Sequence, residues 1–144
     1  METWCRICFD KICREYALKF EMLRENEFVL IGKQFLISFC WFRDERGVYY
    51  IRRNEQGELE RWNLEMHVRF AGKKVKPQKI FAGETGLEIR KNDIFSYAKT
   101  MEHCFGEMLS GGTAWMEEYM KKWYAEVDCR LFGIERQCAK QNHI

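Results

Sequence analysis

The sequence predicts a single α+β domain in which helices pack on an antiparallel sheet. Apolar residues recur at helical spacing near both ends of the chain, and strand-like runs separated by turn residues fill the middle. No shift in composition divides the 144 residues. The expected order is an N-terminal helix, a four-stranded antiparallel meander and C-terminal helices packed on one sheet face, all in one domain spanning 1–144.

Residues 3–25 predict an amphipathic helix. Apolar side chains recur every three or four positions, and charged side chains occupy the other faces. The apolar stripe consists of Cys5, Cys8, Phe9, Ile12, Tyr16, Phe20 and Leu23. We therefore expect this stripe to pack on the sheet.

Four strands are predicted between residues 28 and 70. Residues 28–31 and 34–42 are rich in β-branched and aromatic side chains, and the Gly32-Lys33 dipeptide between them fits a type II′ hairpin turn. A third strand over 48–53 is bounded by turns. In the fourth strand, over 61–70, apolar and polar residues alternate, which predicts one buried and one solvated face. The apolar set is Trp62, Leu64, Met66, Val68 and Phe70, and the polar set is Arg61, Asn63, Glu65, His67 and Arg69.

Two helices are predicted after a connection over 71–90. Asn92 or Asp93 caps the first, which ends at Ser110-Gly111-Gly112, and Thr113 begins the second. The first stripe is Ile94, Tyr97, Ala98, Met101, Phe105 and Met108. The second stripe is Met116, Tyr119, Met120, Trp123 and Val127. A break is expected near Gly133, and the tail beyond Cys138 is expected to fray.

Composition narrows the class of protein. The longest apolar run, 35–42, is far below the roughly 20 residues that a membrane helix needs. The N-terminus lacks a secretory signal pattern, and an odd count of seven cysteines predicts reduced thiols, so a cytoplasmic protein is expected. Basic residues exceed acidic ones only by 24 to 22, so the overall charge favours neither nucleic acid nor a membrane surface.

The Cys5-x-x-Cys8 spacing could be half of a zinc site or a redox pair. The second pair of a zinc signature is absent, and both cysteines fall on the apolar helix face, so core packing is the favoured interpretation. A composite site with Cys138 and His143 would require the termini to meet and is not predicted. We expect no metal and no cofactor.

Catalytic candidates are few. Arg61, Glu65, His67 and Arg69 would project side by side from the fourth strand, and such a group could perform acid–base chemistry on a phosphodiester. An ordinary solvated strand face is the favoured interpretation, because alternation places polar residues there in any case. No nucleophile elbow, phosphate-binding glycine loop or paired-histidine helix motif occurs in the sequence, so a non-catalytic protein is favoured over an enzyme.

Two surfaces are candidates for binding. The sheet carries more aromatic residues than one buried face can hold, and mixed charges flank its turns, a combination typical of protein-binding surfaces. The candidate protein-binding residues are Arg43, Asp44, Glu45, Arg46, Tyr49, Arg52 and Arg53. The candidate phosphate-binding residues of the alternative, a nucleic-acid-associated domain or small enzyme, are Lys73, Lys74, Lys76 and Lys79. The lysine loop lacks interleaved aromatic residues, which makes nucleic acid the less favoured partner.

A helix–glycine–tryptophan pattern occupies the last third of the chain. It consists of a helix over 97–109, its stop at Ser110-Gly111-Gly112, and a following helix that carries Trp115. This layout, mainly over residues 92–128, resembles small bacterial immunity proteins of polymorphic and contact-dependent toxin systems. The resemblance implies an inhibitor that neutralises a cognate toxin by stoichiometric binding, with a toxin domain encoded by an adjacent gene as its partner. It carries over no functional residue.

Overall fold

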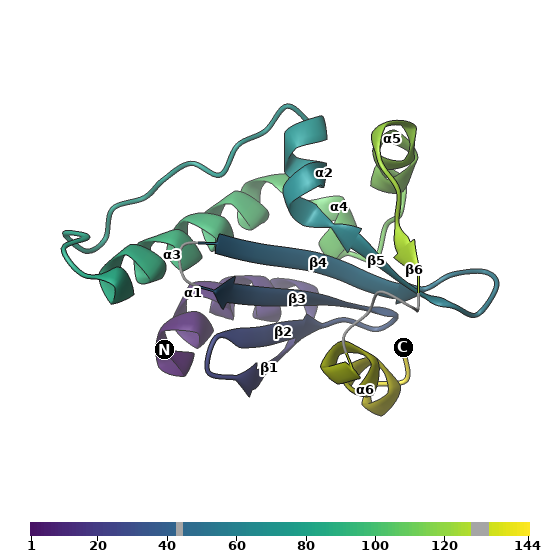
Figure 1. Cartoon of the computed structure of the whole chain (residues 1–144), viewed down its shortest axis with the longest axis horizontal. Helices are drawn as coiled ribbons and strands as arrows, with labels where there is room; N and C mark the ends of the chain where they lie inside the picture. The colour runs from purple at the N-terminus through teal and green to yellow at the C-terminus, as the bar shows by residue number, and fades with distance from the viewer. Residues whose placement is uncertain (43–44, 128–132) are drawn as a thin grey trace.

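The computed structural model describes residues 1–42, 45–127 and 133–144 and has an α+β fold (Figure 1). Within these residues, six strands form one antiparallel sheet in sequence order. The strands are β1 (Lys19–Arg24), β2 (Glu27–Ile31), β3 (Phe35–Phe42), β4 (Glu45–Arg53), β5 (Leu59–Asn63) and β6 (Glu126–Val127). The helices are α1 (Glu2–Tyr16), α2 (Leu64–Phe70), α3 (Gly86–Cys104), α4 (Gly106–Leu109), α5 (Trp115–Lys122) and α6 (Gly133–Gln141). The α+β class is confirmed, but the prediction of four strands is wrong.

The first helix is shorter than predicted. Helix α1 ends at Tyr16, because Ala17 adopts a left-handed conformation (φ 53°) and its N–H bonds the carbonyl of Cys13. The following residues form β1, in which Phe20 lies opposite Leu30 of β2. Phe20 and Leu23 fit the helical spacing by coincidence, because they pack on opposite sides of the sheet.

The predicted fourth strand divides into a strand and a helix. Asn63 ends β5, and its side-chain oxygen accepts hydrogen bonds from the backbone N–H groups of Glu65 (3.0 Å) and Met66 (3.3 Å), which caps α2. The strand prediction for 64–70 is therefore wrong. Three of the five apolar residues assigned to its buried face are nevertheless buried: Trp62, Leu64 and Val68.

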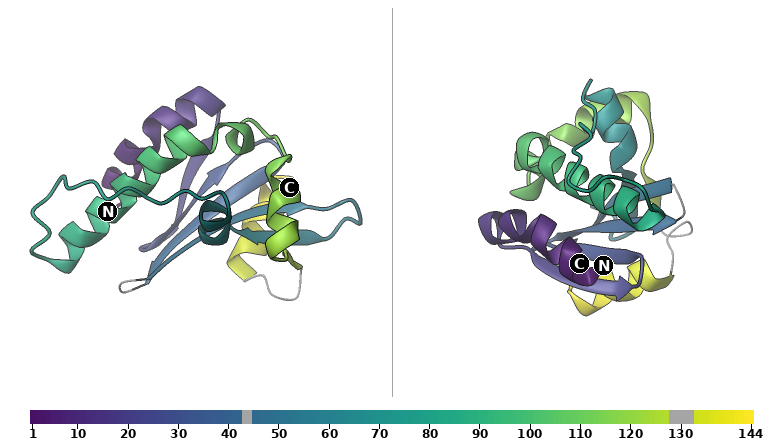
Figure 2. Two further views of the ribbon diagram at one scale, coloured as in Figure 1. Left: turned by 90° about the horizontal axis from the view of Figure 1, so that it is seen from above. Right: turned by 90° about the vertical axis from the view of Figure 1, so that its left-hand side faces the viewer.

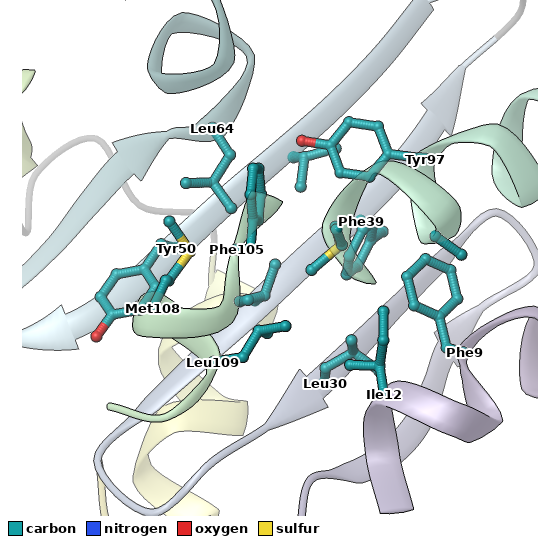
Figure 3. Packing of buried hydrophobic residues seen from close by; sticks show 14 of the residues in the cluster. Phe9, Ile12, Leu30, Phe39, Tyr50, Leu64, Tyr97, Phe105, Met108 and Leu109 are labelled. Atoms are coloured by element: carbon teal, nitrogen blue, oxygen red, sulfur yellow. The ribbon is translucent and has the colours of Figure 1, made fainter. Parts of the chain in front are cut away.

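The larger core lies between one sheet face and helices α1 to α5 (Figure 3). Phe39 on β3 is fully buried against Phe9 of α1 and Tyr97 of α3, at ring-centroid distances of 5.0 and 5.9 Å. The stripe predicted for the helix ending at Ser110 is confirmed as buried: Ile94, Tyr97, Ala98, Met101, Phe105 and Met108. The prediction of one continuous helix is wrong, because α3 ends at Cys104 and α4 begins at Gly106. The helix itself begins earlier than predicted, because Thr85 caps it by accepting the N–H of Glu88 at 3.1 Å.

Helix α6 covers the opposite sheet face (Figure 2). Its Cys138 and Ala139, together with Ile144, form a second core with strand residues of that face. The strand residues are Val29, Ile31, Leu36, Ile51 and Leu59. Helices therefore pack on both faces rather than one, and the segment beyond Cys138, predicted to fray, ends in a buried side chain.

No helix in the described part of the chain combines the length and the apolar character needed to cross a membrane.

Candidate functional site

The predicted protein-binding residues do not form one surface. Along β4, alternate side chains point to opposite sheet faces, so Arg46 and Arg52 share the side of Tyr50, whereas Tyr49 and Arg53 share the side of Ile51. Glu45 is exposed on the second side. The other two predicted residues, Arg43 and Asp44, lie outside the described residues. The surface expected along this strand is therefore divided between two faces.

Arg46 holds three elements together. Its Nε atom bonds a carboxylate oxygen of Glu65 on α2 at 2.5 Å, and its Nη1 atom bonds one of Asp93 on α3 at the same distance. The guanidinium lies over the Tyr97 ring, 4.8 Å from its centroid. Asp93 also accepts the indole N–H of Trp41 at 2.7 Å. This network engages Arg46 inside the protein, which makes the residue a structural tie between β4, α2 and α3.

Arg61 is separated from the other members of the predicted acid–base group. It extends from β5 toward the opposite side of the sheet from Trp62 and is buried over the ring of Tyr49, at 4.2 Å. Its Nε atom donates to Glu126 on β6 at 2.7 Å, and its Nη1 atom lies 3.7 Å from Glu135 on α6. The polar strand face of Arg61, Glu65, His67 and Arg69 does not exist, because the last three lie on α2.

His67 sits among aromatic side chains rather than on a solvated face. Its ring centroid lies 4.9 Å from that of Trp115 and 5.5 Å from that of Phe105. The pKa of His67 is lowered to about 4, mainly by burial and also by the positive charge of Lys73, while Glu107 opposes the shift. The imidazole is therefore neutral at pH 7 and packs as an aromatic group.

This environment predicts a loss of stability on acidification. The imidazole protonates near its ordinary pKa of 6.5 in the unfolded chain but only near 4 in the native protein, so the unfolded state binds more protons between these values. Lowering the pH from 6.5 to 4 should therefore reduce the contribution of His67 by about 1–2 kcal/mol, allowing for its partial exposure. Urea unfolding at several pH values measures this reduction in the free energy of unfolding. His67→Phe keeps an aromatic ring but cannot be protonated, so the variant should not show this pH-dependent loss. If the variant had the same pH profile as the native protein, His67 would not be the group responsible.

The predicted phosphate-binding lysines are all exposed, and two of them line one hollow with a further lysine, here called the cationic hollow. The 71–85 connection runs alongside α3 (Figures 1 and 2). Lys74 and Lys76 line a hollow of about 460 Å³ together with Lys99 and His103 of α3, and Phe95 forms part of its wall. The sequence signal for this hollow is the i, i+4 spacing of Phe95, Lys99 and His103, which places the three residues on one face of α3.

The other two predicted lysines do not join this hollow. Lys79 lines a separate depression near Asn92, and Lys73 lies close enough to His67 to lower its pKa. The four lysines predicted to form one phosphate-binding loop therefore lie in three separate places.

The paired cysteines occupy the larger core. Cys5 and Cys8 are buried, and burial raises the pKa of their thiols to about 11 and 12. Both thiols are protonated at neutral pH, so neither is a strong nucleophile. Cys138 belongs to the second core across the sheet. Among residues 1–42, 45–127 and 133–144, no group of three His, Cys, Asp or Glu side chains is placed to hold a metal ion.

An exposed aromatic surface lies at the end of α5. We call Phe70, Met120, Trp123 and Tyr124 the α5 patch. The Trp123 and Tyr124 rings stack at 5.3 Å, and Phe70 of α2 lies 6.3 Å from Trp123. Trp123 is 42% exposed, Tyr124 49% and Met120 53%. The three rings therefore form one aromatic cluster that is partly open to solvent, with exposed Met120 on the same end of α5.

The end of α5 explains why this surface is exposed. The helix stops at Lys122, and Trp123 takes an extended conformation while its N–H still bonds the carbonyl of Tyr119 at 2.9 Å. The Tyr119 hydroxyl bonds the Asn63 N–H at 3.0 Å and lies 3.5 Å from the Tyr124 carbonyl, which anchors the turn. Trp123 and Val127 do not continue the predicted stripe, because the helix ends at Lys122. Met120 lies on α5 but is exposed, so its assignment to the stripe is also wrong.

Charged side chains of both signs border the α5 patch. Lys122 donates to the Phe70 carbonyl at 3.4 Å and lies over its ring, while Lys121 pairs with Glu118 at 2.8 Å on the solvent side of α5. An apolar centre with a mixed-charge border is the arrangement found at specific protein interfaces. No protein-family model, curated protein or solved structure matches the chain.

Proposed function

We propose that this chain is a non-catalytic protein-binding domain and that the α5 patch is its anchoring surface. The observation that carries the proposal is the stacked, half-exposed pair Trp123 and Tyr124, packed beside Phe70. Trp and Tyr dominate the residues whose removal weakens protein interfaces most, because they bury large areas at a small cost in side-chain entropy. The anchored turn holds both rings in place before a partner arrives, which further lowers the entropy cost of binding.

The partner we propose is a toxin domain encoded by an adjacent gene, with this chain acting in the cytoplasm as a stoichiometric immunity protein. Support comes from the resemblance of residues 92–128 to small bacterial immunity proteins, a segment that includes most of the α5 patch. The mixed charges of Glu118, Lys121 and Lys122 would discriminate between related toxins, since mismatched charges oppose binding. Inhibition by occlusion requires no catalytic residue.

The test is a binding titration between the full chain and the separately purified toxin domain of the adjacent gene. We expect a dissociation constant near nanomolar, about −12 kcal/mol. Trp123→Ala and Tyr124→Ala should each weaken binding by at least about 30-fold, the loss that defines a hot-spot residue. Ile7→Ala is the matched control, because Ile7 is an exposed apolar residue (61%) on α1. Equal affinity of the Trp123 and Ile7 variants would reject the α5 patch, and no binding would reject the toxin partner.

A second candidate function is binding of a nucleic acid through the cationic hollow. The observation in its favour is that Lys74 and Lys76 share the hollow with Lys99 and His103, beside the aromatic ring of Phe95. Purification of the tagged chain from its native host, followed by nuclease treatment, distinguishes the two functions. Recovery of RNA or DNA without a protein partner, lost on replacing these three lysines and weakened steeply by salt, would favour the second candidate.

A further inference from the structure

A cavity of about 770 Å³ opens at the end of the sheet distant from the 71–85 connection. Five segments form its walls: the end of α1, the β2–β3 turn, the end of β4, the loop between α4 and α5, and the C-terminal residues. Its volume lies within the range of small-molecule sites, roughly 300–1,000 Å³. Neither the α5 patch nor the cationic hollow contributes to it, so any ligand here would be independent of both proposed functions.

Tyr50 supplies a buried polar group to this cavity. The residue is 2% exposed, and its ring packs between Phe35 and Trp115, with ring centroids 5.1 Å away in both cases. Figure 3 shows its hydroxyl pointing away from the other labelled core residues. Within the described chain the hydroxyl forms no hydrogen bond. Burial raises the pKa of Tyr50 to about 12, so the phenol remains a hydrogen-bond donor throughout the physiological range.

Arg52 adds a positive charge next to this hydroxyl. It lies two residues further along β4, on the same sheet face, and also lines the cavity. Its Nε atom donates to Glu60 at 2.8 Å, which fixes the guanidinium. In the part of the chain that the structure describes, its two Nη atoms make no hydrogen bond, so they remain able to donate to a ligand.

The charged side chains around the cavity favour an anionic ligand. Three cationic side chains, Lys33, Arg52 and Arg53, line it together with the carboxylate of Glu15. Glu60 offsets the charge of Arg52 from behind. Among these side chains the cations therefore outnumber the carboxylates, which favours an anionic ligand.

We propose that this cavity binds a small organic monocarboxylate. The carboxylate accepts hydrogen bonds from the Tyr50 hydroxyl and the Arg52 guanidinium, and the apolar body of the ligand packs against Phe35, Leu109 and Leu18. These three apolar residues are buried and line the cavity. A few convergent polar groups above an apolar floor are the usual composition of a small-molecule site.

The test uses benzoate and octanoate as probes and the isotopically labelled full chain. Backbone amide NMR signals of Gly32, Lys33 and Gly111, which line the cavity, should shift in a saturable manner with at least one acid. Benzamide, which matches benzoate in shape but carries no charge, should bind at least about 10-fold more weakly than benzoate if benzoate is the better probe.

Three variants decide whether the proposed groups hold the ligand. Tyr50→Phe keeps the ring packing and should weaken binding by about 3- to 10-fold, the effect of one neutral hydrogen bond. Arg52→Gln should weaken it by at least about 10-fold. Arg69→Gln, an exposed site on α2 outside the cavity, should leave affinity unchanged. Absence of saturable shifts with both acids would overturn the proposal, as would unaltered affinity in Tyr50→Phe, a variant that leaves the Arg52–Glu60 pair intact.

Discussion

Replacing Trp62 with alanine should lower the free energy of unfolding by about 3–5 kcal/mol. Its side chain is 3% exposed and packs against Trp115 and Tyr119, with centroid distances of 5.3 and 5.0 Å. Alanine would leave a cavity between β5 and α5. The change would also remove the indole N–H that donates to the buried Glu60 carboxylate at 3.1 Å. Loss of transfer energy, loss of packing and loss of this hydrogen bond all act in the same direction.

Urea unfolding of the two tryptophan variants measures this effect with a matched control. Trp123→Ala makes the same chemical change at a side chain that is 42% exposed, so it should cost less than about 1 kcal/mol. A difference of at least about 2 kcal/mol between Trp62→Ala and Trp123→Ala is therefore expected. Similar losses for both variants would mean that α5 does not pack on β5 as described. The same comparison shows whether Trp123→Ala is suitable for binding experiments.

Arg61→Met should destabilise the protein by about 3–5 kcal/mol, because it removes one member of a buried ionic group. Arg61 is 8% exposed and lies between Glu126 on β6 and Glu135 on α6, of which Glu135 is itself buried. Methionine fills much of the same volume but leaves both carboxylates without this cation. The loss arises mainly from removing the cation that lies between these two carboxylates, since the ion pair itself adds little net stability.

Arg69→Met controls for the change of residue type, because Arg69 is exposed on α2. It should alter the free energy of unfolding by less than about 0.5 kcal/mol. Adding Glu135→Gln to Arg61→Met should recover at least about 1 kcal/mol, because the second change removes a buried carboxylate that faces Arg61 in the native protein. A double variant no more stable than Arg61→Met would show that the loss of Arg61 does not destabilise the protein through Glu135.

The sequence predicted best the parts of the fold whose signals are local and strong. Strands at 28–31, 34–42 and 48–53 correspond to β2, β3 and β4, because β-branched and aromatic runs were bounded by turn residues. The apolar stripe that runs from α3 into α4 was long enough to identify the buried face of this segment. Both signals depend on neighbours along the chain, and the tertiary structure did not override them.

In short segments the predicted element is wrong, because the same residues can fit both a helical and a strand periodicity. Leu64 and Val68 are four apart, so they fit one face of a helix as well as alternate positions of a strand. Asn63, the cap of α2, was the signal that separated the two cases. In β1, Phe20 continued the helical spacing of α1 although the left-handed Ala17 had already ended the helix. A two-residue strand such as β6 carries no periodic signal at all.

The sequence predicted the candidate surfaces only in part. The sequence shows Lys74 and Lys76 as part of a cluster of positive charges. Their position beside Lys99 and His103 depends on where the 71–85 connection lies along α3. Trp123 was assigned to a buried stripe because nothing in the sequence locates the end of α5 at Lys122. The cavity at Tyr50 draws its walls from five separate segments, and such convergence is a property of the tertiary structure.

The order of the strands also bears on how the chain folds. Strands β1 to β4 each pair with the next strand along the chain, so closing each hairpin orders only a short loop. In contrast, β5 and β6 pair across 65 residues, as the Arg61–Glu126 contact does. We expect the five-stranded meander to form early and β6 to join it late, after α2 to α5 have packed. The turn at Trp123 and Tyr124 immediately precedes β6, so the proposed partner-binding surface would mature in the closing stage of folding.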